Sequence, residues 1–363
     1  MAGKSTLNRL EHTPKHDAAK YHKIDCDEAQ VDALLVDVFL EAHERAPREI
    51  VLDLDNTDIP LHGTQEGRHY HGHYDGYCYL PLYVFYGRHL LLARQRRANV
   101  AGSDGAVEEV ARIIAQIRQT WPRVRIVLRA DSGFCNDPLL SWCEANRVDY
   151  VFGLARNSRL EAALVTQLAQ AKELSLGSGK PARVFRDFCY CTHKSWSRTQ
   201  RVVGKAEHTL DGANPRFVVT SLKRTGAGDD ARSLYEDLYC ARGEAENRIG
   251  EQFELFADRA SSATMAANLP ARSRSFASAK AGQLRMWFSA LAYLLVDTLR
   301  RVGLRHSQFA DAAAQTIRLK LLRLGAQVRT SARRIQFAIA SGCPNQAEFA
   351  VAHIRRQRAF SSA

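Results

Sequence analysis

Glu49–Asp55, which reads EIVLDLD, is the stretch that decides the fold. It is rich in apolar and β-branched residues, and its aspartates stand at alternate positions. Because side chains along a strand point alternately to opposite faces, Asp53 and Asp55 share one face while Leu52 and Leu54 share the other. The stretch therefore predicts a strand that carries two carboxylates on one face, an arrangement that is unusual for a core strand.

A second predicted strand also ends in an acid. Val124–Ala130 (VRIVLRA) is followed directly by Asp131. Further strands are predicted at Tyr77–Tyr86, His89–Ala93 and Tyr150–Leu154, with helical periodicity between them. Alternating strands and helices predict an α/β domain with a mixed sheet, and ligands gather where strands of such a sheet end.

Composition limits the classes of partner. The 363 residues contain 51 Lys and Arg against 39 Asp and Glu, a formal charge of +12, which suits a polyanion. The eight cysteines form no CxxC pair, so they predict reduced thiols. The N-terminus lacks an apolar signal region, and Met286–Val296 is far shorter than the roughly 20 residues that cross a bilayer. We therefore expect a cytoplasmic protein without a membrane partner.

A third acid is offered by Tyr239–Glu251 (YCARGEAENRIGE), predicted to be helical. Tyr239, Arg242 and Glu246 stand three and four residues apart, which places them on one helix face. Arg242 and Glu246 alone could be an ordinary surface ion pair, which contributes only a few tenths of a kcal/mol. The helix becomes informative only in combination with the two strand-end aspartates.

Three segments in order, LDLDNTD (52–58), RADSGF (129–134) and YCARGEAEN (239–247), resemble the motifs of insertion-sequence DDE transposases, in the subgroup with a Tyr-x-x-Arg-x-x-x-Glu helix. The resemblance implies a ribonuclease-H-like core in which Asp55, Asp131 and Glu246 are the catalytic carboxylates. Asp55 is preferred because Thr57 reproduces the Asp-x-Thr pattern of the family. Asp53 remains the alternative.

The resemblance also implies the chemistry and its partners. Three carboxylates would hold Mg²⁺ (or Mn²⁺), and two metal ions about 4 Å apart can activate the attacking oxygen and stabilise the leaving one. Tyr239 and Arg242 would contact phosphate. The expected function is cleavage and transfer of DNA strands at insertion-sequence ends. The partners would be double-stranded DNA, as terminal inverted repeats and target, and a second copy of the chain in a homodimer.

Two departures from the family pattern suggest an alternative function. Only residues 1–48 precede the first strand, where related enzymes usually carry a longer DNA-binding region, which suggests an N-terminally truncated chain. Phe253 stands where some relatives have a lysine. The alternative is a catalytically inactive transposase remnant that still binds DNA.

Two other groups of residues suggest binding sites. A cluster of potential zinc ligands makes a zinc site a minor alternative: His62, His69, His71, His73 and Cys78. Basic residues of the C-terminal region together suggest phosphate contacts: Arg300, Arg301, Arg305, Arg318, Lys320, Arg323, Arg329, Arg333 and Arg334.

The expected domain organisation has five parts. They are an N-terminal arm and helix (1–46), the first part of the ribonuclease-H-like core (47–176), an inserted β subdomain (177–228), a catalytic helix that completes the core (229–262) and a basic helical C-terminal region (263–363).

Overall fold

The computed structural model describes residues 26–61, 66–224, 230–255, 279–340 and 342–361. The described part of the chain divides into two compact units, the first ending at Glu246 and the second beginning at Asn247. The predicted N-terminal arm, residues 1–25, lies outside the described residues. The division between the units falls inside helix α8 (Gly243–Leu255), directly after Glu246.

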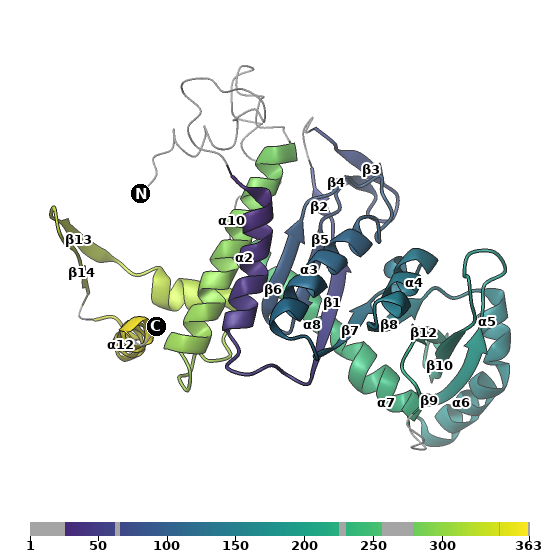
Figure 1. Ribbon diagram of the computed structural model, residues 1–363. Helices are drawn as coiled ribbons and strands as arrows, with labels where there is room; N and C mark the ends of the chain where they lie inside the picture. The colour runs from purple at the N-terminus through teal and green to yellow at the C-terminus, as the bar shows by residue number, and fades with distance from the viewer. Residues whose placement is uncertain (1–25, 62–65, 225–229, 256–278, 341, 362–363) are drawn as a thin grey trace. The chain divides into compact units, whose positions relative to one another are not determined.

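A nine-stranded mixed sheet forms the centre of the first unit (Figure 1). Its main order is β11-β10-β12-β8-β7-β1-β5-β6, and β9 pairs with β10. The strands are β1 (Glu49–Asn56), β5 (Leu82–Tyr86), β6 (His89–Arg94), β7 (Arg125–Ala130), β8 (Asp149–Leu154), β9 (Ala182–Tyr190), β10 (Gln200–Thr209), β11 (Gly212–Ala213) and β12 (Arg216–Thr220). The pairs β1–β7 and β7–β8 are parallel, and the other pairs are antiparallel. This confirms the predicted α/β class with a mixed, ribonuclease-H-like sheet.

Each face of the sheet has its own hydrophobic core. Leu52 and Leu54 belong to the larger core, which includes buried residues of α2 (Glu28–Glu41), α3 (Ala106–Thr120) and α4 (Asp137–Ala145). Val127 and Val151 belong to the core on the other face, where Leu234 and Tyr235 cover them. As predicted, the leucines and the aspartates of β1 point to opposite faces. The aspartates therefore lie on the face that residues 230–239 cover.

The strands predicted for residues 177–228 do form, but they extend the central sheet. β12 pairs antiparallel with β8, and β10 and β9 follow it. Phe217 and Val219 belong to one core and Val218 to the other, so β12 is buried on both faces like a central strand. The expected start of the β segment at residue 177 falls near the end of α6 (Val165–Ser178), which follows α5 (Ser158–Ala163).

The single strand predicted at Tyr77–Tyr86 is wrong, because the structure divides it. β4 (Gly76–Tyr79) joins β2 (Ile59–Pro60) and β3 (His69–His71) in a small separate sheet, and β5 joins the central sheet. Pro81 lies between them and has no N–H to donate to a ladder, so pairing stops there.

The second unit contains α10 (Ala279–Thr298), α11 (Ala314–Ile317), α12 (Gln346–Ser361) and π-helical turns at Leu299–Gly303 and Arg318–Leu322. The prediction of an entirely helical C-terminal region is wrong at one place, where β13 (Ala326–Thr330) and β14 (Ile335–Ile339) form a hairpin. Large apolar residues at alternate positions of Ile335–Ile339 (IQFAI) favour a strand over a helix. None of the helices described is long and apolar enough to span a bilayer.

Candidate active site

The parallel register of β1 and β7 brings two acids to the same edge of the sheet. Leu54 pairs with Ala130 at the end of the β1–β7 pairing, so the next residues along the two strands, Asp55 and Asp131, lie beside one another. Because Ala130 also pairs with Phe152 of β8, Gly153 reaches this edge beside Asp131. The sequence predicted the two acidic strand ends, and the register makes them neighbours.

Asp53 has a different environment from Asp55. Its carboxylate accepts two hydrogen bonds from Arg129, which lies directly across the ladder, with Arg129 Nη2 2.8 Å from Asp53 Oδ2. Arg129 Nη1 also donates to the carbonyl of Leu238. Burial raises the pKa of Asp53, against the lowering effect of Arg129. Both carboxylate oxygens of Asp53 are therefore engaged in a buried structural pair.

Asp55 is buried but incompletely satisfied. The residue is only 4% exposed, and its Oδ1 accepts a hydrogen bond of 2.9 Å from the backbone N–H of Asn56. Oδ2 is buried and has no hydrogen-bond partner among the described residues. Burial raises the pKa of Asp55 to about 7, Arg242 opposes this rise, and the nearby charges of Asp131 and Glu246 add to it. A buried acceptor without a donor, among other acids, is where a cation would be stabilised.

Asp131 is held at the start of a short 3₁₀ turn (Ser132–Phe134). Its Oδ1 accepts a hydrogen bond of 2.8 Å from the backbone N–H of Gly133, and the residue is partly exposed. A Cβ atom at position 133 would stand 3.1 Å from this oxygen, which makes the small residue useful there. The turn fixes the direction of the carboxylate while leaving its second oxygen accessible.

The segment that carries Tyr239, Arg242 and Glu246 is not one regular α-helix. It begins with α7 (Asp230–Ser233), continues as a π-helical stretch (Leu234–Tyr239) and a 3₁₀ turn (Cys240–Arg242), and becomes α-helical at Gly243. The prediction of a uniform helix from Tyr239 is therefore corrected. Irregular helical turns of this kind are frequent at functional sites, because they re-aim side chains relative to a regular helix.

Arg242 lies between two of the predicted carboxylates. Its Nη2 is 2.7 Å from Glu246 Oε1, and its Nη1 is 3.4 Å from Asp55 Oδ1. Burial alone would lower the pKa of Arg242, but Asp55 and Glu246 outweigh it and raise the pKa. The Glu246 side chain is 59% exposed. Arg242 thus links the helix to the strand-end acids through its two ion pairs. In the described part of the chain no three His, Cys, Asp or Glu side chains stand close enough together to hold one metal ion.

Tyr239 packs against the same edge from the covered face. A Cβ atom added to Gly153 would be 2.5 Å from the Tyr239 hydroxyl and 2.9 Å from the backbone nitrogen of Ser132. Burial raises the pKa of Tyr239, and Asp131 adds to the rise. The absence of a side chain at Gly153 is therefore what lets the phenol lie beside Asp131. No pattern in the sequence indicates this role of Gly153.

Tyr74 approaches the acids from the small sheet. Burial raises its pKa to about 12, and the charges of Asp58, Asp55 and Asp131 contribute. The phenol is a hydrogen-bond donor close to the carboxylates.

A cavity of about 400 Å³ opens next to Tyr239 and Ser132. Two of its lining residues, Arg156 and Arg216, are cationic, and Tyr235 and Phe217 are aromatic. Both arginines were missed in the sequence, although Arg156 directly follows β8, where ligands of α/β sheets are expected. The cavity places positive charge beside the acidic edge.

The sequence also suggested a zinc site and a group of C-terminal arginines that contact phosphate. Among the described candidates for zinc, His69, His71, His73 and Cys78 form no group that could hold a metal ion, while His62 lies outside the described residues. Arg300 is 3% exposed and pairs with Asp297 and Glu251, and Arg301 also pairs with Asp297. These two arginines are therefore paired with acids, and their contact with phosphate stays a prediction.

The comparison with known proteins agrees with this architecture. A family model described as "Transposase DDE domain group 1" matches residues 1–359. A search of curated proteins finds no match. Because the family model covers nearly the whole chain, the chain belongs to the group 1 family of transposase DDE domains.

Proposed function

We propose that this transposase cleaves and joins DNA strands at the terminal inverted repeats of an insertion sequence, and that it uses Asp55, Asp131 and Glu246 as ligands for Mg²⁺ or Mn²⁺. Its substrates would be those repeats and a target duplex, and the active form on DNA would be a homodimer. The observation that carries the proposal is the buried Oδ2 of Asp55, an acceptor beside Asp131 for which the described part of the chain supplies no donor.

The residues present suit a hard divalent cation. Carboxylate oxygens are the ligands that Mg²⁺ prefers, and Asp55 and Asp131 offer them from adjacent parallel strands. When bound, such ions lower the pKa of an attacking water or hydroxyl and neutralise charge on the leaving oxygen. Arg242 holds Glu246 near Asp55 through its ion pairs. Transfer of the guanidinium from the carboxylates to a DNA phosphate would leave Glu246 free to complete the ligand set.

The remaining side chains position the substrate in this proposal. Arg242 can make two parallel hydrogen bonds to a phosphate, which a lysine cannot reproduce. The Tyr239 hydroxyl, next to Ser132, would donate to a neighbouring phosphate oxygen. Arg156 and Arg216 line the adjacent cavity and would add positive potential along the strand. In this proposal the carboxylates face the reacting phosphodiester, and the arginines bind the phosphates on either side of it.

The test compares the chain with Asp131→Ala on labelled DNA that carries the ends of its own element, with Mg²⁺, with Mn²⁺ and with EDTA. We expect cation-dependent nicking at the ends, reduced at least about a thousandfold by the substitution, as for removal of a group that acts on the transition state. Equal cleavage by both proteins would reject the proposed site. Binding of the ends without any cation-dependent cleavage would instead identify a DNA-binding remnant.

A further inference from the structure

The hairpin of β13 and β14 is exposed on both of its faces. Every residue of β13 is exposed, and every residue of β14 except Ile339. Among the strands that the structure describes, these two pair only with one another. An isolated two-stranded hairpin is marginally stable in water, so a hairpin that other elements do not cover is a candidate for binding a partner.

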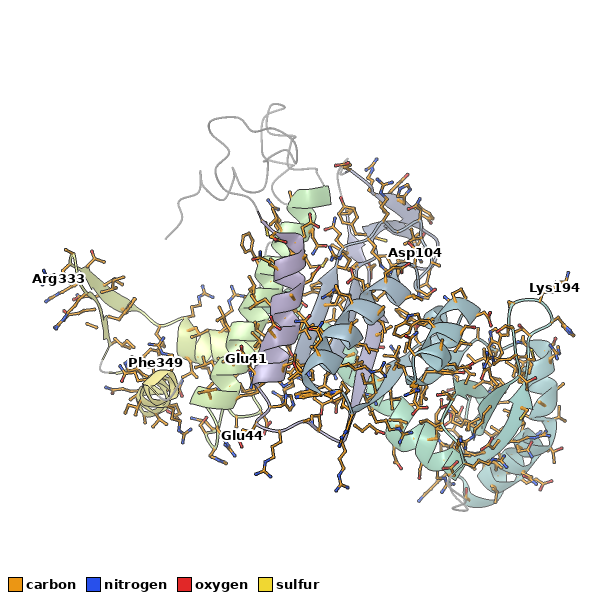
Figure 2. The ribbon with its side chains drawn as sticks, viewed as in Figure 1. Glu41, Glu44, Asp104, Lys194, Arg333 and Phe349 are labelled. Atoms are coloured by element: carbon orange, nitrogen blue, oxygen red, sulfur yellow. The ribbon has the colours of Figure 1, made fainter. Side chains whose placement is uncertain are left out.

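The two faces of the hairpin differ in chemistry. Val328 pairs with Phe337, and Thr330 with Ile335, so these residues share an apolar face. Arg329 pairs with Gln336, and Gln327 with Ala338, on the opposite, polar face. The turn between the strands adds Arg333 and Arg334, and Figure 2 shows Arg333 at the tip of the hairpin. We call Gln327, Arg329, Arg333, Arg334 and Gln336 the basic ribbon.

The charge of the basic ribbon is not neutralised by the surrounding sequence. From Ala312 to Ala347 the chain has no Asp or Glu and six Lys or Arg. Within the described residues, no carboxylate lies within 4.0 Å of the guanidinium groups of Arg329, Arg333 or Arg334. This differs from Arg300 and Arg301 of the same unit, which are paired with acids. The ribbon therefore offers cations and amides to a polyanion.

We propose that the basic ribbon binds duplex DNA as a two-stranded β-ribbon, through residues other than the carboxylates. The inference rests on the proposed function, in that DNA is the substrate. The major groove, about 12 Å wide, admits a two-stranded ribbon, and arginine and glutamine are side chains that contact phosphates and base edges there. The three arginines would supply mainly phosphate contacts and so affinity that depends on salt.

The test measures binding of the full chain to a mixed-sequence duplex by fluorescence anisotropy over a series of salt concentrations. The triple variant Arg329→Ala/Arg333→Ala/Arg334→Ala is compared with Arg123→Ala/Lys180→Ala/Lys194→Ala, which removes the same charge from exposed positions of the first unit. We expect the ribbon variant to bind at least about tenfold more weakly, and to flatten the slope of log K against log salt by about 2 to 3. The control variant should keep the slope of the parent.

A charge-conserving variant, Arg329→Lys/Arg333→Lys/Arg334→Lys, should restore the salt slope and so exclude misfolding as the cause. An unchanged slope in the alanine variant, or an equal loss in the control, overturns the proposal. It is also overturned if Val328→Ser/Phe337→Ser abolishes self-association while the alanine variant binds DNA normally, because the hairpin would then serve a second copy of the chain. Asp131→Ala tests the chemistry independently: it should bind with the parental slope and not cut. Cutting by Asp131→Ala would refute the proposed site and leave the ribbon standing.

Discussion

Asp53 and Asp55 lie on the same face of one strand, yet they meet different neighbours. Arg129 stands across the ladder from Asp53 and engages both of its oxygens. Asp55 is two residues closer to the strand end, where Asp131, Arg242 and Glu246 are its charged neighbours. Two aspartates only two residues apart on one strand therefore have different roles: Asp53 belongs to a structural ion pair, and Asp55 is a candidate metal ligand.

Substitution of each aspartate by asparagine should separate these roles. Asp53→Asn leaves the buried Arg129 without its counter-charge, so we expect a loss of about 3 to 5 kcal/mol in the free energy of unfolding, with Mn²⁺ binding retained. Asp55→Asn should abolish Mn²⁺ binding without that loss. Urea unfolding and calorimetric titration with Mn²⁺ measure both quantities. The opposite assignment of the two aspartates would give the reverse pattern.

The raised pKa of Asp55 predicts how stability depends on pH when metal is absent. The folded pKa of about 7 lies above the ordinary value of 3.8, so the folded state holds an extra proton between these values. The contribution of Asp55 is therefore fully present below pH 4 and is lost as the pH rises through 7, by an amount on the order of a few kcal/mol.

Thermal unfolding in EDTA between pH 5 and 8 checks this. The melting temperature of the parent should fall, relative to Asp55→Asn, as the pH rises, and Mg²⁺ should reverse the fall at pH 8. Parallel curves for the two proteins would show that the Asp55 carboxyl is ionised throughout the range.

At the scale of elements, the site is built by two parallel strands and one irregular helical segment. The register of β1, β7 and β8 sets Asp55, Asp131 and Gly153 side by side, and the turn types of residues 234–242 direct Tyr239 and Arg242 toward them. The close approach of Tyr239 to β8 depends on Gly153. Packing of the helical segment and geometry of the site are thus coupled at a single glycine.

Gly153→Ala should therefore damage the site more than the fold. Its Cβ would stand 2.5 Å from the Tyr239 hydroxyl, so we expect nicking to fall at least about tenfold with the phenol displaced. Gly204→Ala is the matched control, since its Cβ would meet the Leu164 side chain at 2.8 Å in the core and should cost about 1 to 3 kcal/mol of stability.

Tyr239→Phe removes the atom that would stand closest to the new Cβ, so the double variant Gly153→Ala/Tyr239→Phe should nick DNA little less than Tyr239→Phe alone. If both glycine variants lost stability and nicking in equal proportion, the specific role of Gly153 would be refuted.

At the scale of the whole molecule, the carboxylates and the basic ribbon belong to different compact units. Asp55, Asp131 and Glu246 all lie in Thr13–Glu246, and β13–β14 lies in Asn247–Ala363. A chain with two such units need not unfold in one step. Ligands that bind only the folded form of one unit should stabilise that unit alone.

We accordingly expect two transitions in calorimetry, of which Mn²⁺ raises only one. Asp55→Asn should remove the shift, whereas the alanine variant of the basic ribbon should leave it unchanged. A single transition that Mn²⁺ moves as a whole would show that the units unfold together.

The sequence by itself determined the local features of this protein. Alternation in Glu49–Asp55 predicted a strand with two acids on one face, and the spacing of Arg242 and Glu246 predicted their contact, because both follow from the periodicity of a single element. The mixed sheet and the motif order followed from the same local patterns. The hairpin in the C-terminal region was missed, although its alternation is visible at Ile335–Ile339.

Only the tertiary structure decided which residues meet. Arg129 pairs with Asp53, Gly153 leaves room for the Tyr239 side chain, and Arg156 and Arg216 line one cavity. The residues that meet in each case lie far apart along the chain, and no motif in the sequence marks them as neighbours. Strand register and the packing of the helical segment set these distances. Such long-range pairing depends on the burial of both faces of the sheet at once, which no local periodicity encodes.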